Sequence, residues 1–105
     1  MTPRWTFLTI VVLTGLGSIS AHAETIRVVI DKLVFSPAEV QAKVGDTIEW
    51  VNKDVFAHTA TATNRAWDVA LAPKQTARVT LTKPGVEDYF CKYHPNMKGR
   101  VTTAP

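Results

Sequence analysis

The chain has 105 residues, a net charge of +3, a hydrophobic fraction of 46% and a single cysteine. Its 12 basic and 9 acidic residues are scattered, whereas nucleic acid requires a basic stripe, so we expect no nucleic-acid partner. One cysteine excludes a disulfide within the chain. Cys91 is therefore a reactive thiol, a metal ligand or one half of an intermolecular pair.

The first 23 residues have the layout of a secretory signal peptide. Arg4 provides a positive start, residues 5–16 form an apolar run, and residues 21–23 (Ala-His-Ala) are a small-x-small cleavage site. A membrane anchor is the alternative, but the apolar run is short for a bilayer span and lacks a flanking stop-transfer charge. We therefore predict that residues 24–105 form a mature periplasmic domain that is not attached to a membrane.

The mature part predicts about seven short strands, in chain order. Alternation and β-branched residues indicate strands at 25–31, 40–44, 47–52, 58–63, 76–82, 86–91 and 99–103. The alternation at 40–44 and 47–52 suggests half-buried strands of an antiparallel sheet. Residues 64–75 are less regular and are expected to form a loop with a turn of helix. Because no segment keeps a helical period for long, the pattern predicts an all-β sandwich or barrel.

The stretch CKYHPNMKG, at the end of a predicted strand, concentrates residues that bind metals. Cys91, His94 and Met97 lie within seven residues, so one loop presents all three to a single point. His58 begins an earlier strand, and two strand ends at the same pole of a sandwich can meet. Two imidazoles, a thiolate and a thioether suit copper in both oxidation states. A trigonal His₂Cys site with a long axial Met is typical of blue-copper electron-transfer proteins.

Each of these residues also has a structural interpretation on its own. A lone Cys or Met is usually a buried apolar residue, and a lone His is often a hydrogen-bonded loop residue. Zinc also binds His₂Cys sets, but zinc gains little from a thioether. A catalytic thiol needs a His that is oriented by a third group, and Asn96 is the only apparent candidate, too close in sequence to His94. Four ligands would leave no open position for a substrate, so we expect no enzyme.

Three segments, VGDTIEWVNKD, AHT and GVEDYFCKYHPNMKGRV, resemble the cupredoxins (small blue-copper proteins), and most of all the amicyanin type. Plastocyanins and pseudoazurins are wider relatives with longer ligand loops. The resemblance extends over residues 25–103 and implies a Greek-key β-sandwich with one copper ion at one pole. It also implies that His58, Cys91 and His94 are equatorial ligands and that Met97 is the axial ligand.

The resemblance further implies a carrier that passes one electron at a time between redox partner proteins outside the cytoplasm, and we expect a monomer. Exposed apolar residues around His94 (Phe56, Ala57, Tyr93 and Pro95) are expected to form the docking surface. Scattered lysines near the same pole (Lys53, Lys92 and Lys98) would favour acidic partners. The alternative is a protein that delivers copper without turning over electrons. Such proteins commonly use Met-rich or His-rich clusters, and this chain has only two methionines.

This sequence departs from the amicyanin pattern beside both histidines. Thr59 stands where amicyanins usually have an Asn that ties the two ligand loops together, and its hydroxyl is expected to donate a shorter hydrogen bond. Ala57 and Tyr93 stand where amicyanins tend to have Pro, and Tyr93 is bulky enough to cover or reorient the second histidine. Asn52 is expected to fix the loop before the first histidine through hydrogen bonds to the backbone.

Overall fold

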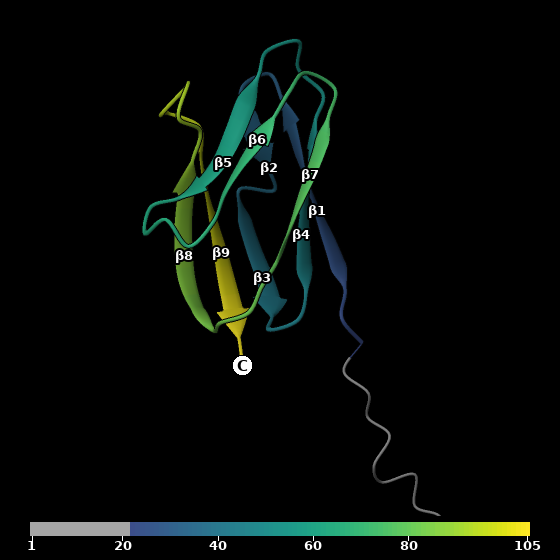
Figure 1. Cartoon of the computed structure of the whole chain (residues 1–105), viewed down its shortest axis with the longest axis vertical. Coiled ribbons are helices and arrows are strands. Elements are labelled where there is room, and N and C mark those ends of the chain that lie inside the picture. The colour runs from purple at the N-terminus through teal and green to yellow at the C-terminus, as the bar shows by residue number, and fades with distance from the viewer. Residues whose placement is uncertain (1–21) are drawn as a thin grey trace, which may run out of the picture.

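The computed structural model describes residues 22–105, and these residues form nine strands and no helix (Figure 1). The strands are β1 (Thr25–Asp31), β2 (Val34–Ser36), β3 (Glu39–Lys43), β4 (Thr47–Asn52), β5 (His58–Ala62), β6 (Asp68–Leu71), β7 (Thr76–Thr80), β8 (Gly85–Phe90) and β9 (Lys98–Ala104). They form a four-stranded sheet in the order β2-β1-β4-β7 and a five-stranded sheet in the order β3-β9-β8-β5-β6. The two sheets pack face to face, which confirms the predicted all-β sandwich.

The core lies between the two sheets and is built by the alternation of side chains along each strand. Val28 and Ile30 on β1, and Ile48 and Trp50 on β4, are fully buried. The opposite sheet contributes Tyr89 on β8, whose ring centroid lies 5.5 Å from that of Trp50 in an edge-to-face arrangement. Aromatic pairs of this geometry add to the free energy gained by burial alone.

The prediction of antiparallel pairing is wrong for β3 and correct for only one of the two neighbours of β4. β4 pairs parallel with β1 and antiparallel with β7, and β3 pairs parallel with β9. Alternation of side chains has the same period of two in both kinds of ladder, so it indicates a half-buried strand without giving the direction of its neighbour. Val44, the last residue of the predicted strand 40–44, lies beyond β3 and is exposed.

Two strands were not predicted, which is why there are nine rather than about seven. β6 lies where a loop with a turn of helix was expected, and it pairs antiparallel with β5 at the edge of its sheet. Its side chains do alternate in burial, but its sequence (DVAL) has three apolar residues in a row, so this alternation is not visible in the sequence. β2 has three residues, too few for a periodic pattern.

The sandwich brings two loops to one pole. β5 and β8 are antiparallel neighbours, so the loop that enters β5 (residues 53–57) and the loop that leaves β8 (residues 91–97) lie at the same end. Figure 1 shows this end opposite the C-terminus. The predicted signal peptide falls outside the described residues apart from its last two. Within residues 22–105, no helix is long and apolar enough to cross a membrane.

Candidate metal centre

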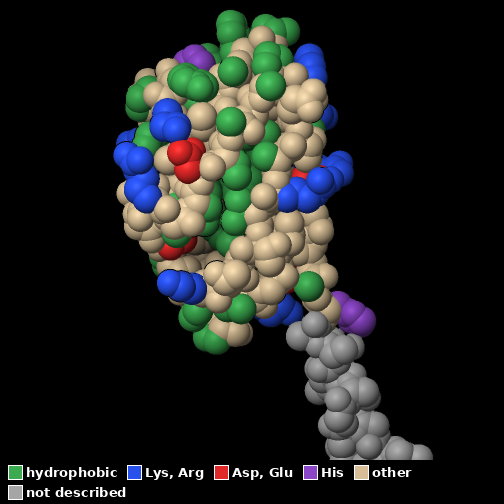
Figure 2. All heavy atoms as spheres, viewed as in Figure 1, with side chains coloured by type: hydrophobic (Ala, Val, Ile, Leu, Met, Phe, Trp, Pro, Cys, Tyr) green, Lys and Arg blue, Asp and Glu red, His purple; other side chains and the backbone are tan. Residues whose placement is uncertain are grey.

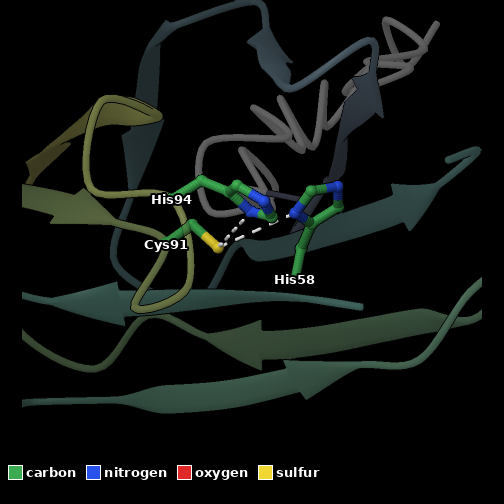
Figure 3. A group of neighbouring side chains, drawn as sticks. All are labelled: His58, Cys91 and His94. Atoms are coloured by element: carbon green, nitrogen blue, oxygen red, sulfur yellow. Dashed lines mark hydrogen bonds between the residues drawn. The ribbon is translucent and has the colours of Figure 1, made fainter. Parts of the chain in front are cut away.

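Three of the four predicted ligands converge at this pole (Figure 3). The Cys91 Sγ lies 3.7 Å from the Nδ1 of His58 and 4.0 Å from the Nδ1 of His94. The three donor atoms all lie within 4.8 Å of one another. His58 and Cys91 are fully buried, whereas His94 is partly exposed. The cluster therefore presents one sulfur and two nitrogens to a shared point just beneath the surface.

The spacing of these donors fits a single bound ion. Sulfur and nitrogen ligands at about 2.3 and 2.0 Å from one first-row metal ion lie about 3.7 Å apart when the bond angle is trigonal. The two sulfur–nitrogen distances of 3.7 and 4.0 Å agree with that separation. A set of two imidazoles and one thiolate matches the His₂Cys arrangement that copper occupies in electron-transfer sites.

The ligand loop is closed by its own backbone. The Cys91 N–H donates to the carbonyl of Met97 at 3.1 Å, and the Met97 N–H donates to the carbonyl of His94 at 2.8 Å. Pro95, directly after His94, has a fixed φ that restricts the turn further. Met97 is 3% exposed, so its thioether is held inside the protein at this pole. The short C-x-x-H-x-x-M spacing thus produces one tight, hydrogen-bonded turn.

His58 is oriented by a carboxylate that the sequence analysis missed. The Nε2 of His58 lies 2.8 Å from the Oδ2 of Asp54, which is itself buried. When the carboxylate accepts the Nε2 proton, the lone pair of Nδ1 is free to face Cys91 and bind a metal. Metal-ligating histidines usually have such a partner, which fixes the tautomer and raises the basicity of the ring. The interpretation of Asn96 as the only candidate for orienting a histidine is therefore wrong.

Asp54 remains ionised despite its burial. Burial alone would raise the pKa of this carboxyl group, but hydrogen bonds from the Leu33 amide, the His58 ring and the Lys32 amide hold its pKa below the ordinary value of 3.8. The amides of Lys32 and Leu33 lie 2.7 and 3.0 Å from its two oxygens. The position of Asp54 four residues before a strand-start histidine was the available signal, but the intervening loop could equally have pointed it into solvent.

Asn52 fixes the loop before His58, as predicted. Its side-chain amide donates to the carbonyl of Phe56 at 2.8 Å, and its carbonyl accepts the N–H of Asp54 at 3.0 Å. The same amide also lies 3.2 Å from the carbonyl oxygens of Leu71 and Ala72, which tie the loop to β6. The loop is therefore anchored at both ends around the carboxylate that orients His58.

Thr59 links the two ligand loops, but in a different role from the one expected. Its hydroxyl accepts the N–H of Lys92 at 2.9 Å, where we had expected it to donate across the loops. Its own backbone N–H lies 3.4 Å from the Cys91 sulfur and points at it as a donor. Thr59 thus hydrogen-bonds both the sulfur of Cys91 and the backbone N–H of Lys92, the next residue.

Asp54, His58 and Cys91 are arranged in the order of a nucleophilic triad, the arrangement that a catalytic thiol would need. The Cys91 side chain and the His58 ring both have 0% exposure, so no substrate reaches the sulfur. A second imidazole, from His94, also faces the same sulfur and has no role in such a triad. The geometry favours a metal site.

Fold and donor set together define a class: small all-β proteins that hold one metal ion at one pole between two imidazoles and a thiolate. The family model of the cupredoxin-like domain matches residues 5–103, so the chain belongs to the cupredoxin family. The cofactor of this site is accordingly one copper ion.

Within that family, the chain is similar to amicyanins. Amicyanin of Paracoccus denitrificans is 32% identical over 78 residues, which cover 69% of this chain but only 60% of that protein. The structure of amicyanin from Paracoccus versutus matches with a TM-score of 0.67 and 30% identity, over 83% of this chain and 86% of that one. A Cu-containing nitrite reductase from Thermus scotoductus also matches, with a TM-score of 0.71 and 29% identity, over 77% of this chain and 22% of that one.

Proposed function

We propose that this protein is a periplasmic type 1 copper protein that carries one electron at a time between redox partners. The observation that carries the proposal is the convergence of His58, Cys91 and His94, of which the first two are fully buried and His94 is partly exposed. These three residues would be the equatorial ligands, and the buried Met97 would be the axial ligand. When bound, copper supplies the change between Cu(II) and Cu(I), and the sulfur and nitrogen donors suit both states.

His94 provides the route for electrons to and from the surface. It is the only partly exposed member of the donor set, and its ring lies 6.4 Å from that of Phe56. Exposed apolar side chains surround it, because Phe56 and Tyr93 are 55% and 61% exposed. Figure 2 shows hydrophobic side chains gathered at this end of the molecule, beside a histidine. An apolar surface of this kind lets a partner approach closely and separate quickly, since such encounters bury little area.

The lysines near this pole contribute less charge than their number suggests. Lys92 pairs with Asp68 at 2.9 Å, so its charge is largely balanced. Lys53 and Lys98 are exposed, and Lys53 lies in the loop that leads to His58. We propose that these charges favour acidic partner proteins, and that the rate of electron transfer falls modestly as the salt concentration rises.

We also propose that the protein is exported, cleaved before Glu24 and monomeric. The backbone nitrogen of Glu24 lies 2.9 Å from the Oδ1 of Asp46. In a chain that begins at Glu24, this nitrogen would be an ammonium group facing a carboxylate, which is a stronger interaction than an amide hydrogen bond. This contact supports cleavage at that bond because the new terminus would be held rather than left free.

The visible spectrum of the purified, copper-loaded protein tests the proposed function. We expect an intense blue Cu(II)–thiolate band that reduction abolishes. Cys91→Ser should remove the band while the thermal unfolding transition persists, because the sulfur supplies the colour and other core residues supply most of the stability. A colourless copper complex of the wild-type protein would rule out a type 1 site.

Copper delivery and catalysis are the competing functions. Cyclic voltammetry separates delivery from electron transfer, because a carrier gives a reversible wave whereas a delivery protein loses the metal in one oxidation state. The nitrite reductase that shares the fold is matched over only 22% of its length, so the likeness concerns one part of a larger chain. We propose that this protein is not an enzyme, and copper-dependent turnover of nitrite or oxygen would contradict that.

A further inference from the structure

A closed ring of hydrogen bonds begins and ends at Lys92, the residue directly after Cys91. The Lys92 N–H donates to the Thr59 hydroxyl at 2.9 Å, and the hydroxyls of Thr59 and Thr61 lie 3.0 Å apart. Thr61 donates to Asp68 at 2.8 Å, and the Lys92 ammonium group lies 2.9 Å from the other oxygen of that carboxylate. Thr59 and Thr61 are 2% and 0% exposed, so water does not compete for the bond between their hydroxyls, whereas the Lys92–Asp68 bond lies at the surface.

The carboxylate fixes the direction of every hydrogen bond in the ring. Hydrogen bonds from Lys92 and Thr61 hold the pKa of Asp68 below its ordinary value of 3.8, so at neutral pH it can only accept. Thr61 has one hydroxyl proton and gives it to Asp68. The Thr59 hydroxyl must then donate to Thr61, and its lone pairs are left to accept the N–H of Lys92.

We propose that Asp68 and Thr61 are positioning residues for the Cys91 ligand and thereby raise the reduction potential of the copper site. The inference rests on the proposed function. The ring holds the Thr59 backbone in place, and the Thr59 N–H points at the Cys91 sulfur from 3.4 Å. A hydrogen bond to a thiolate stabilises its negative charge, and the reduced site has more of that charge.

The geometry of strands β5 and β6 places the side chains of this ring next to one another. Thr59 and Thr61 are two residues apart on β5, so their side chains lie on the same side of the strand. Thr61 is the register partner of Asp68 across the β5–β6 ladder. The edge strand β6 thus reaches the ligand loop through two buried hydroxyls, although Asp68 itself is 38% exposed and touches no predicted ligand.

Thr61→Val is the decisive variant because it breaks the ring without changing charge or volume appreciably. We expect its reduction potential to fall, with the equilibrium constant for reduction changing about threefold, or about 28 mV at ~59 mV per tenfold for one electron. Thr61→Ser, which keeps the hydroxyl, should restore the wild-type potential. Asp88→Ala is the matched control, since it removes a carboxylate on the same sheet that pairs with Arg100 and makes none of the hydrogen bonds of the ring.

A double-mutant cycle isolates the role of Asp68 from its charge. Asp68→Ala removes a negative charge in both backgrounds, so its effect in the wild type minus its effect in Thr61→Val reports only the coupling through the ring. We expect a coupling of the same size as the Thr61→Val shift. Additive effects, or equal potentials for the Val and Ser variants, would overturn the proposal.

Hydrogen exchange of the Lys92 amide keeps this test separate from the proposed function. In the metal-free protein, Thr61→Val should speed this exchange about tenfold while amides of β1 are unchanged. If the wild-type copper protein gives neither a blue band nor a reversible wave, the proposed function fails, and a faster Lys92 exchange would still support the ring as a positioning device. Unchanged exchange together with an unchanged potential or spectrum would overturn it.

Discussion

One aspartate lies just before strand β4 and another just after it, and at opposite poles of the sandwich both accept hydrogen bonds from backbone amides. Asp46 accepts the amides of Glu24 and Lys43, both at 2.9 Å. Asp54 accepts the amides of Lys32 and Leu33 at 2.7 and 3.0 Å. Asp46 bonds Glu24, just before β1, and Asp54 bonds Lys32, just after it, so both fix the parallel pairing of β1 with β4.

The difference between them is one hydrogen bond. Asp54 also bonds the His58 ring, whereas the hydrogen bonds of Asp46 go to backbone amides alone. The two carboxylates therefore start from the same structural role, and only the one at the metal pole is also connected to a ligand. The orientation of His58 therefore depends on Asp54, a carboxylate that also fixes the pairing of β1 with β4. The following changes should separate the two roles.

Asp54→Asn should have the largest effect. The amide side chain presents either an N–H₂ group or a weaker acceptor to the Nε2 of His58. The tautomer with its proton on Nε2, which leaves the lone pair of Nδ1 free to bind the metal, is then no longer favoured. We expect copper affinity to fall about 10–100-fold, the usual cost of losing an outer-shell partner. Loss of charge-assisted bonds should also lower the free energy of unfolding by about 2 kcal/mol. Competition with a chelator of known affinity measures the first effect.

Asp46→Asn is the matched control for Asp54→Asn. It makes the same chemical change at the other pole, so copper affinity should stay within twofold of the wild-type value, a margin of roughly 0.4 kcal/mol. Equal losses of affinity in the two variants would show that His58 responds to general destabilisation of the β1–β4 pair and not to its own hydrogen bond.

Two glycines give a second contrast between the poles. At the metal pole, a Cβ on Gly99 would lie 2.3 Å from the ring of Tyr89, which is packed in the core. Gly45, at the other pole, has a φ of +99° and nothing within 4 Å of its would-be Cβ. Gly99→Ala should therefore cost about 1–3 kcal/mol through displacement of the ring. Gly45→Ala should cost about 1 kcal/mol through backbone strain alone.

Urea unfolding of the two alanine variants measures this contrast. The Gly99 variant should also change the near-UV circular dichroism, because Tyr89 contacts Trp50, whereas the Gly45 variant should leave that signal unchanged. An unaltered aromatic signal in the Gly99 variant would mean that the core accommodates the methyl group without moving the ring.

The ligand loop and most strands could be predicted because their information is local. Cys91, His94 and Met97 lie within seven consecutive residues. The alternation of side chains identifies a half-buried strand such as β1 even when its neighbouring strands are unknown. Asp54 could not be assigned, since its contact with His58 depends on how the 53–57 loop folds back under the control of Asn52.

Parallel pairing and outer contacts could not be predicted for a related reason. The fold brings β9 beside β3 and Thr61 beside Asp68, and the local sequence around β3 or Asp68 does not indicate either partner. The sequence thus predicts which residues a site contains more readily than which residues orient them.

The pH dependence of the free energy of unfolding should reveal the contribution of the hydrogen bonds that the Asp46 carboxylate accepts from Glu24 and Lys43. Hydrogen bonds from the amides of Glu24 and Lys43 lower the pKa of Asp46 below its ordinary value of 3.8. Because the folded state favours the ionised form, this contribution is present above pH 3.8 and is lost as the pH falls further. Asp46→Asn should lower the melting temperature by roughly 4–8 °C at pH 7. The gap between variant and wild type should narrow below pH 3.8, and a constant gap would mean that ionisation of Asp46 is irrelevant.

The smallest effect concerns the terminus that Asp46 holds. If cleavage leaves Glu24 first, its ammonium group faces the carboxylate at the position where the backbone nitrogen now lies, 2.9 Å away. A chain that begins at Glu24 should melt roughly 2–4 °C higher than one carrying a single extra alanine before it, and high salt should reduce the gap. In the Asp46→Asn background the extra alanine should make no difference. A gap that persists there would assign the effect to the added residue itself, and mass spectrometry of the exported protein would establish which terminus the cell makes.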